Sequence, residues 1–368
     1  MRLRTLAAGL ATLQCAAAGR AATQDSPFAI RGLGMPGRFE SVRARATGGA
    51  FAAFDLLSAL ADVSIVSATR LSATAAGAGS YLHDDLNGVS TDRRTGRFPL
   101  LQVSGPVGGG LVLGGGFTTY LDRSYRVAIA DTLVLDGSRQ VVSDNLSSDG
   151  GISDLRIAAA RQFGPLAVGA GFHLLSGSAR VRAERVFSDT SVYRSVAEVS
   201  EIAYTGAGYS ASAILTVARG LALAGYWRSD THLTSTIDST TVASNDLPVT
   251  TGGALRWQPT PAVIIGASVT RRTWAGTVSA GAYNTVGWSA GLQVGPSRLP
   301  LRLGVRGGQL PFGPGGVAPR EWAAAAGSGV TFAGGQGVID FAVERLRRTG
   351  SGLSETVWTG LFGLTVRP

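Results

Sequence analysis

Residues 338–348 read VIDFAVERLRR, and apolar and charged side chains alternate along this stretch. In an extended chain, successive side chains point to opposite faces, so Phe341 and Val343 fall on one face and Asp340 and Glu344 on the other. One face of such a strand suits hydrocarbon and the other suits water. The pattern is typical of a strand in a transmembrane β-barrel, whose outer face meets lipid and whose lumen is polar.

The same alternation recurs from about residue 62 to the C-terminus. Tight turns such as Gly164-Pro165 alternate with longer polar segments such as 183–196. Bacterial barrels show this asymmetry, because their periplasmic turns are short and their extracellular loops are long. The turns predict about fourteen strands, at 63–81, 97–105, 109–123, 151–163, 165–182, 197–218, 220–236, 247–258, 261–275, 283–295, 299–311, 320–333, 336–348 and 355–367.

The composition agrees with a barrel wall. Glycine accounts for 52 of the 368 residues, and charged residues for only 15%. Low charge with an ordinary apolar share fits a thin wall between lipid and water better than a large soluble surface. The chain has no lysine, which excludes a P-loop lysine and a Schiff-base lysine. The net charge is +9, but the arginines are dispersed rather than gathered in a patch, so we expect no nucleic-acid partner.

The N-terminus has the features of a secretory signal peptide. Arg2 and Arg4 precede a short apolar run at 6–13, and small residues follow it. The only cysteine, Cys15, lies inside this signal, so we expect no disulfide in the mature chain. No later stretch reaches 18 apolar residues, and a membrane-spanning chain without such a helix must close into a barrel.

These observations predict three parts: a signal peptide at 1–22, an N-terminal plug or hatch segment at 23–62, and an outer-membrane β-barrel at 63–368. The fold class is therefore all-β, a transmembrane antiparallel barrel of about 14 strands in the outer membrane of a Gram-negative cell. A flexible periplasmic tail is the alternative for the second part. The candidate plug residues are Arg43, Arg45, Gly48, Gly49, Phe51 and Phe54.

Residues 45–55, RATGGAFAAFD, resemble the plug-region motif of the FadL-like outer-membrane transporters, which precedes the first strand of their barrel. The C-terminal hairpin at 337–367 is similar to the last two strands of that broad superfamily. The chain departs from the family pattern at 56–61, LLSALA, where an Asn-Pro-Ala motif is usual, and it lacks the usual terminal aromatic residue. The resemblance implies a fourteen-stranded barrel, an N-terminal hatch and diffusion of hydrophobic substrates such as long-chain fatty acids.

Single charged residues alternate with apolar ones on several predicted strands. An arginine facing lipid at the bilayer midplane would cost about 2–4 kcal/mol, so we expect these charges to face inward. Two interpretations remain open: an electrostatic network that packs the interior, or an anion-favouring path or carboxylate site. The candidate lumen-lining residues are Asp154, Arg156, Arg256, Arg272, Arg302, Arg306, Asp340 and Glu344.

Two glycine-containing motifs invite other interpretations. The run Gly287-Trp288-Ser289-Ala290-Gly291 matches the G-x-S-x-G nucleophile elbow, but it lies in an alternating segment with no helical pattern after it, so we expect no hydrolase there. Gly114, Gly115 and Gly116 lie in the predicted strand 109–123. Glycines within a strand permit a kink. In a FadL-like barrel we expect a kink here to form a side opening to the bilayer.

The function predicted from the sequence is passive uptake of hydrophobic or amphipathic small molecules through the barrel. The alternatives are a general porin and a structural or secretion-associated barrel that binds a protein partner. No enzyme activity and no cofactor are expected. No metal is expected either, because no histidine has a partner at metal-ligand spacing. The expected partners are outer-membrane lipid, the barrel-assembly machinery and a hydrophobic small-molecule ligand.

Overall fold

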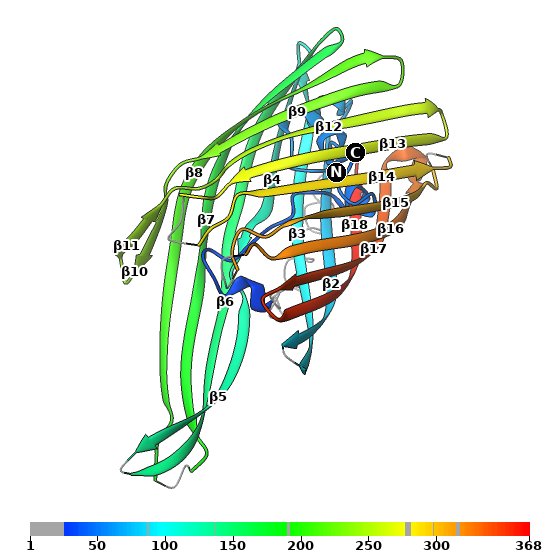
Figure 1. Ribbon diagram of the computed structural model, residues 1–368. Helices are drawn as coiled ribbons and strands as arrows, with labels where there is room; N and C mark the ends of the chain where they lie inside the picture. The colour runs from blue at the N-terminus through cyan, green and yellow to red at the C-terminus, as the bar shows by residue number, and fades with distance from the viewer. Residues whose placement is uncertain are drawn as a thin grey trace, which may run out of the picture.

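The computed structural model describes residues 26–86, 88–135, 137–189, 192–276, 281–296, 298–313 and 317–368. The predicted signal peptide lies outside these residues. The described chain folds as one antiparallel sheet that closes on itself (Figure 1). Within it, no helix has the length and apolar character needed to cross a bilayer.

Fourteen strands form the wall, as the turn pattern predicts, and the ring closes where the last strand pairs with the first, for example at Gly360 and Gly79. In chain order the wall strands are β2(Ser72–Leu86), β3(Val89–Gly108), β4(Leu111–Asp122), β6(Ser138–Phe163), β7(Leu166–Phe187), β8(Val196–Ala218), β9(Leu221–Asp230), β12(Val249–Thr260), β13(Val263–Thr273), β14(Thr285–Val294), β15(Leu301–Gln309), β16(Arg320–Phe332), β17(Gly337–Gly350) and β18(Leu353–Val366).

The remaining elements lie outside this ring of fourteen. Strand β5(Tyr125–Leu135) pairs with the first part of β6, and these strands project with β7 well beyond the barrel at the lower edge of Figure 1. The projection marks the long-hairpin end of the barrel. The other elements are β1(Met35–Pro36), β10(Leu233–Ile237), β11(Thr240–Asn245), the α-helix α2(Val42–Ala46) and the 3-10 helices η1(Pro27–Ala29), η2(Ala52–Phe54), η3(Asp62–Ser67) and η4(Ala333–Gly335).

Strand β17 shows the two faces of the wall. Phe341 and Val343 point outward with 47% and 54% of their surface exposed, whereas Asp340 and Glu344 are buried on the inner face. The alternation read from the sequence therefore places apolar side chains toward lipid and charges toward the lumen, as a membrane barrel requires.

The first wall strand begins later than predicted. The sequence pattern predicts a strand from residue 63, but Asp62–Ser67 form the helix η3, and β2 begins at Ser72. All four of the first residues of η3 are buried. Because both apolar and polar positions are enclosed, the short alternation at 63–66 reflects packing on all sides rather than one wet and one dry face.

The predicted kink at Gly114, Gly115 and Gly116 is wrong. These glycines pair in unbroken register with β3 on one side and β6 on the other. They leave room inside the wall instead, since a Cβ on Gly114 would lie 3.1 Å from the Ile65 side chain. The register of β4 against β6 shifts further along, between Thr119 and Leu121.

We predict that Phe341→Arg will destabilise the folded barrel by about 2–4 kcal/mol, because the charge would face the hydrocarbon. Thr349→Arg, at the exposed end of the same strand, is the matched control and should cost about 0–1 kcal/mol. The measurement is urea unfolding in lipid vesicles. Equal costs for the two variants would contradict the assignment of this face to lipid.

Candidate functional site

The segment Ser26–Leu71 lies inside the ring of strands, against the inner face of the wall (Figure 1). Helix α2 packs on β15–β18, and η3 packs on β4 and β6–β8. Glycines on the inner face make this close approach possible. A Cβ on Gly291 or Gly304 would collide with the backbone of Thr47, and a Cβ on Gly169 would collide with Val63.

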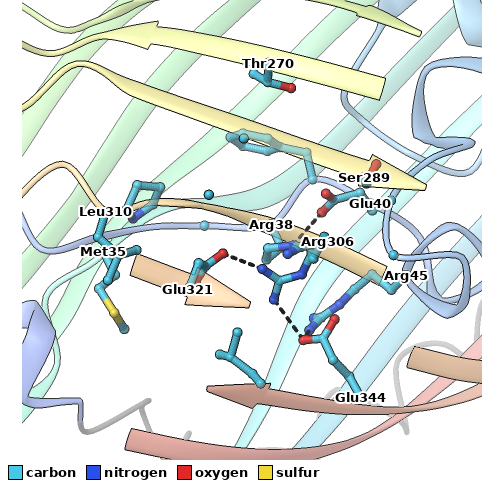
Figure 2. Close-up of a pocket in the computed structure, with 18 of the residues that line it drawn as sticks. Met35, Arg38, Glu40, Arg45, Thr270, Ser289, Arg306, Leu310, Glu321 and Glu344 are labelled. Atoms are coloured by element: carbon cyan, nitrogen blue, oxygen red, sulfur yellow. Dashed lines mark hydrogen bonds and ion pairs between the residues drawn. The ribbon is translucent and has the colours of Figure 1, made fainter. Parts of the chain in front are cut away.

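A first cluster of charges, here called the Glu344 cluster, joins this segment to β15–β17. Arg306 bonds Glu321 and also lies 3.1 Å from Glu344, and Arg45 of α2 reaches the same Glu344 oxygen at 2.8 Å. Figure 2 shows these side chains converging on one region of the lumen, with Arg38 and Glu40 beside them. All the groups are largely buried, so each charge needs a partner of opposite sign.

A second cluster, the Asp62 cluster, joins η3 to strands β6–β9. Asp154 accepts hydrogen bonds from Arg228 at 2.6 Å and from His173 at 2.9 Å. The other nitrogen of His173 lies 2.8 Å from the Ser210 hydroxyl, which donates to Asp62 at 2.6 Å. This chain of bonds links the wall to the N-terminal segment through buried polar groups.

Ser210, His173 and Asp154 have the order of a hydrolytic triad, but the protons are arranged differently. A serine nucleophile must give its proton to the histidine. Here the Ser210 hydroxyl has one proton and directs it to the Asp62 carboxylate, which can only accept when ionised. The geometry therefore favours anchoring of the segment over activation of Ser210.

Arg156 adds further bonds between the wall and the segment. Its guanidinium donates to Asp62 at 3.2 Å and to the Ala59 carbonyl at 3.1 Å. The Ser212 hydroxyl accepts from the Val63 backbone N–H at 2.9 Å. These contacts hold the residues just before β2 in place.

The eight predicted lumen-lining residues all lie on the inner face. Six of them are buried and paired in the interior, including Arg302, which bonds Asp340 at 2.7 Å. Arg256 and Arg272 are partly buried, and neither has an ion pair with another described residue. Several other residues of these buried polar networks were not predicted from the sequence, because each bonds a residue far away in the chain. They are Asp62, His173, Ser210, Arg228, Glu321, Arg348 and Glu355.

Most predicted plug residues contact the wall or stabilise the segment itself. Arg45 belongs to the Glu344 cluster, and Phe51 lies against Gly266. Gly48 and Gly49 have φ angles of +67° and +97°, which other residues rarely adopt, so the tight turn after α2 needs glycine. Phe54 packs against a cluster of small and apolar wall residues.

Asp55 organises the turn around α2. It accepts hydrogen bonds from Arg43 at 2.6 Å and from Ser58 at 2.9 Å, and also bonds Ser41. Burial alone would raise the pKa of the Asp55 carboxyl. The positive charge of Arg43 and the hydrogen bonds from Arg43, Ser41 and the Leu57 backbone outweigh this effect and hold the pKa below its ordinary value of 3.8. Asp55 is therefore ionised at neutral pH.

The G-x-S-x-G match around Ser289 lies in an ordinary stretch of strand β14. Residues 287–291 pair continuously with β13 and β15, and the Ser289 hydroxyl lies 2.7 Å from that of Ser268 on the next strand. Among the described residues, no group of three or more histidine, cysteine, aspartate or glutamate side chains could hold a metal ion.

The N-terminal segment leaves little free space in the lumen. A cavity of about 190 Å³ lies between it and strands β13–β18 and β2–β4, with both charged and apolar lining. A second cavity of about 30 Å³ lies near His173 and Ser210. Phe39, Leu60 and Arg272 line both cavities. The larger one is smaller than an ordinary ligand pocket, which measures about 300–1,000 Å³.

We predict that Asp55→Asn will loosen the N-terminal segment. The loss of this buried charge leaves Arg43 unpaired, which should cost about 1–3 kcal/mol and raise amide hydrogen exchange at residues 41–58 by about tenfold or more. Because the folded-state pKa is lowered, the stabilisation should be present above pH 3.8 and lost as the pH falls through the folded-state pKa.

Asp92→Asn is the control for Asp55→Asn, because the Asp92–His83 pair is exposed and should contribute little. Equal exchange at residues 41–58 in wild type and Asp55→Asn at neutral pH would show that Asp55 does not organise the segment.

Comparison with known proteins places the fold. No family model matches the sequence, and no curated protein sequence matches it. Among solved structures, the CymD monoaromatic hydrocarbon channel matches with a TM-score of 0.57 and 12% identity, over 91% of this chain and 98% of that one. The toluene transporter TodX of P. putida matches with a TM-score of 0.59 and 12% identity, over 91% and 99%.

A TodX mutant, described as a deltaS2S3 monoaromatic hydrocarbon channel, matches with a TM-score of 0.61 and 13% identity, over 90% of this chain and 99% of that one. At such identities the likeness establishes architecture. The barrel fold that the resemblance implies is thus confirmed, and the chain has the barrel fold of the FadL-like channels.

Proposed function

We propose that this protein is an outer-membrane channel for the passive uptake of hydrophobic or amphipathic small molecules. One observation carries the proposal: its own N-terminal segment occupies the lumen of a closed barrel and leaves a cavity of about 190 Å³. A general porin needs a continuous aqueous passage. The barrel fold points to the outer membrane, and the structures it resembles are described as channels for toluene and other monoaromatic hydrocarbons.

In this proposal Ser26–Leu71 is a plug that must shift for a substrate to pass. The way in which it is attached supports this role. Only the two-residue strand β1 pairs with a wall strand, at Met35–Asp122 and Pro36–Leu121. Beside β1, backbone N–H groups of Ser26 and Gly37 donate to the carbonyls of Ser124 and Tyr120. Most of the remaining contacts involve side chains, such as those of the Asp62 cluster, and these can break without separating the wall strands.

We further propose that substrates leave sideways, between β3 and β4. The pairing of these strands ends at Leu100 and Thr118. Beyond that point β3 continues to Val89, and its pairs in the described part of the chain are with β2. A cleft of about 310 Å³ lies there, lined by Phe98, Leu121 and several glycines, and also by Arg97 and Asp122, whose ion pair joins β3 to β4. An exit at this position would replace the kink predicted at Gly114–Gly116.

A disulfide between the plug and the wall tests whether the plug must shift for a substrate to pass. We predict that Asp62→Cys combined with Ser210→Cys, when oxidised, will reduce uptake of labelled toluene by Gram-negative cells about tenfold or more, because the plug can no longer shift. Reduction with a thiol should restore uptake. Sugar entry, measured by liposome swelling, should stay low in both states, because no continuous aqueous passage is opened.

Ser268→Cys combined with Ser289→Cys is the matched control. These side chains lie at a similar separation, 2.7 Å between hydroxyl oxygens, but join two wall strands. Oxidation should leave its uptake unchanged. Unchanged uptake in the oxidised plug-to-wall variant would refute the plug, and rapid swelling with sugars would support the porin.

A side chain that fills the cleft tests the exit. We predict that Gly96→Trp will reduce toluene uptake about tenfold while the barrel still folds, because a Cβ at this exposed position meets nothing closer than 4.0 Å. Gly225→Trp is the control, since Gly225 is an exposed wall glycine with nothing within 4 Å of its Cβ position. Equal uptake by the two variants would exclude exit through this cleft.

A further inference from the structure

A groove of about 630 Å³ runs along the outer face of the barrel, over β14–β17. Its lining combines aromatic and cationic side chains that point away from the lumen. We call it the arginine groove and define it by Trp288, Arg320, Trp322, Arg345 and Arg347. It opens on the outer side of the wall, and it shares part of its lining with the lumen cavity of about 190 Å³, namely Trp288, Gly307, Gly308, Gln309 and Glu321.

The strand register brings Arg320 and Arg347 close together, and Arg345 lies one step along β17, opposite Ala324. Arg347 is directly opposite Trp322, and Arg320 is opposite Thr349 one step further along the same pair of strands. Side chains opposite each other in an antiparallel pair lie about 5 Å apart, and diagonal neighbours about 7–8 Å. Arg345 follows on β17, with its guanidinium 5.6 Å from the centre of the Trp358 ring.

These three arginines have no acidic partner among the residues that the structure describes. The carboxylates next to them in sequence are both bound on the inner face: Glu321 by Arg306 and Arg348, and Glu344 by Arg306 and Arg45. Neighbouring like charges on a sheet repel each other. An anion between the guanidinium groups would remove this repulsion, and phosphate matches their fork of donors.

The groove lies at the depth where lipid head groups are expected. On β17 the outward column runs from Phe341 and Val343 to Arg345 and Arg347, so the charges begin where the apolar band ends. Strand β17 rises toward the long-hairpin end of the barrel. Trp322, which is half exposed, belongs with the aromatic side chains that mark a membrane interface.

We propose that the arginine groove binds a phosphorylated lipid of the outer leaflet, with its phosphate held by Arg320, Arg345 and Arg347 and its acyl chains along Phe341 and Val343. This proposal requires that the barrel lie in a bilayer, but it does not require uptake. Free phosphate shares the chemistry of the head group, so the test must separate the two.

The test is lipid binding to the full protein in detergent micelles, measured by native mass spectrometry. The probe is bisphosphorylated lipid A, compared with the same lipid after removal of its phosphates. The expected result is one retained lipid A per barrel, with weaker retention of the dephosphorylated lipid. Arg320→Gln, Arg345→Gln and Arg347→Gln together should weaken lipid A binding about tenfold or more, because charge-assisted hydrogen bonds are lost.

The control substitutes three exposed arginines elsewhere on the barrel, namely Arg94→Gln, Arg161→Gln and Arg219→Gln. It should bind lipid A as the wild type does. Circular dichroism confirms that both triple variants fold, and toluene uptake, measured separately, shows whether the channel still works. Equal binding by the two triple variants, or equal binding of the dephosphorylated lipid, would overturn the proposal. So would displacement of lipid A by inorganic phosphate at an equal concentration.

Discussion

The structure depends on one constraint: a charge in the wall of a membrane barrel cannot face hydrocarbon, and a charge that faces a crowded lumen needs a partner. On β17 the constraint sends Asp340 and Glu344 inward. Glu344 then pairs with Arg306 of β15 and with Arg45 of the N-terminal segment, which packs against β17. The polar face of the wall therefore holds the segment, and the segment neutralises part of the wall.

The same constraint explains why the lumen is narrow. Inner-face glycines such as Gly291 and Gly304 let the segment approach the wall backbone closely, and the Asp62 cluster ties its far end to β6–β9. Close packing limits the cavities to a small mixed space.

Much of the fold could be predicted from the sequence, because outward apolar side chains alternate with inward polar or small ones along the wall strands. The outward column of β17 and the short turns at Gly164-Pro165 are local features, so periodicity and turn chemistry find them. The start of β2 could not be found in this way. The alternation at Val63–Ile65 looks like that of a strand, but these residues are enclosed on every side in η3.

The candidate site was harder to predict, because its bonds join residues far apart in the chain. The inward orientation of Asp154 and Arg156 follows from alternation. The contact of Asp62 with Ser210, on the other hand, depends on where the N-terminal segment lies, and no periodic pattern reports that. At Gly116 the sequence pattern was misleading. The glycine run suggests a bend in the strand, but Gly116 instead makes room for the side chain of Gln102.

The barrel's closure by its own N-terminal segment is tested most directly by single-channel conductance in a planar bilayer. The full mature chain should conduct almost no ions, and a variant lacking residues 26–61 should conduct steadily through the emptied lumen. Steady conductance at the level of a general porin by the full chain would contradict this account of the interior.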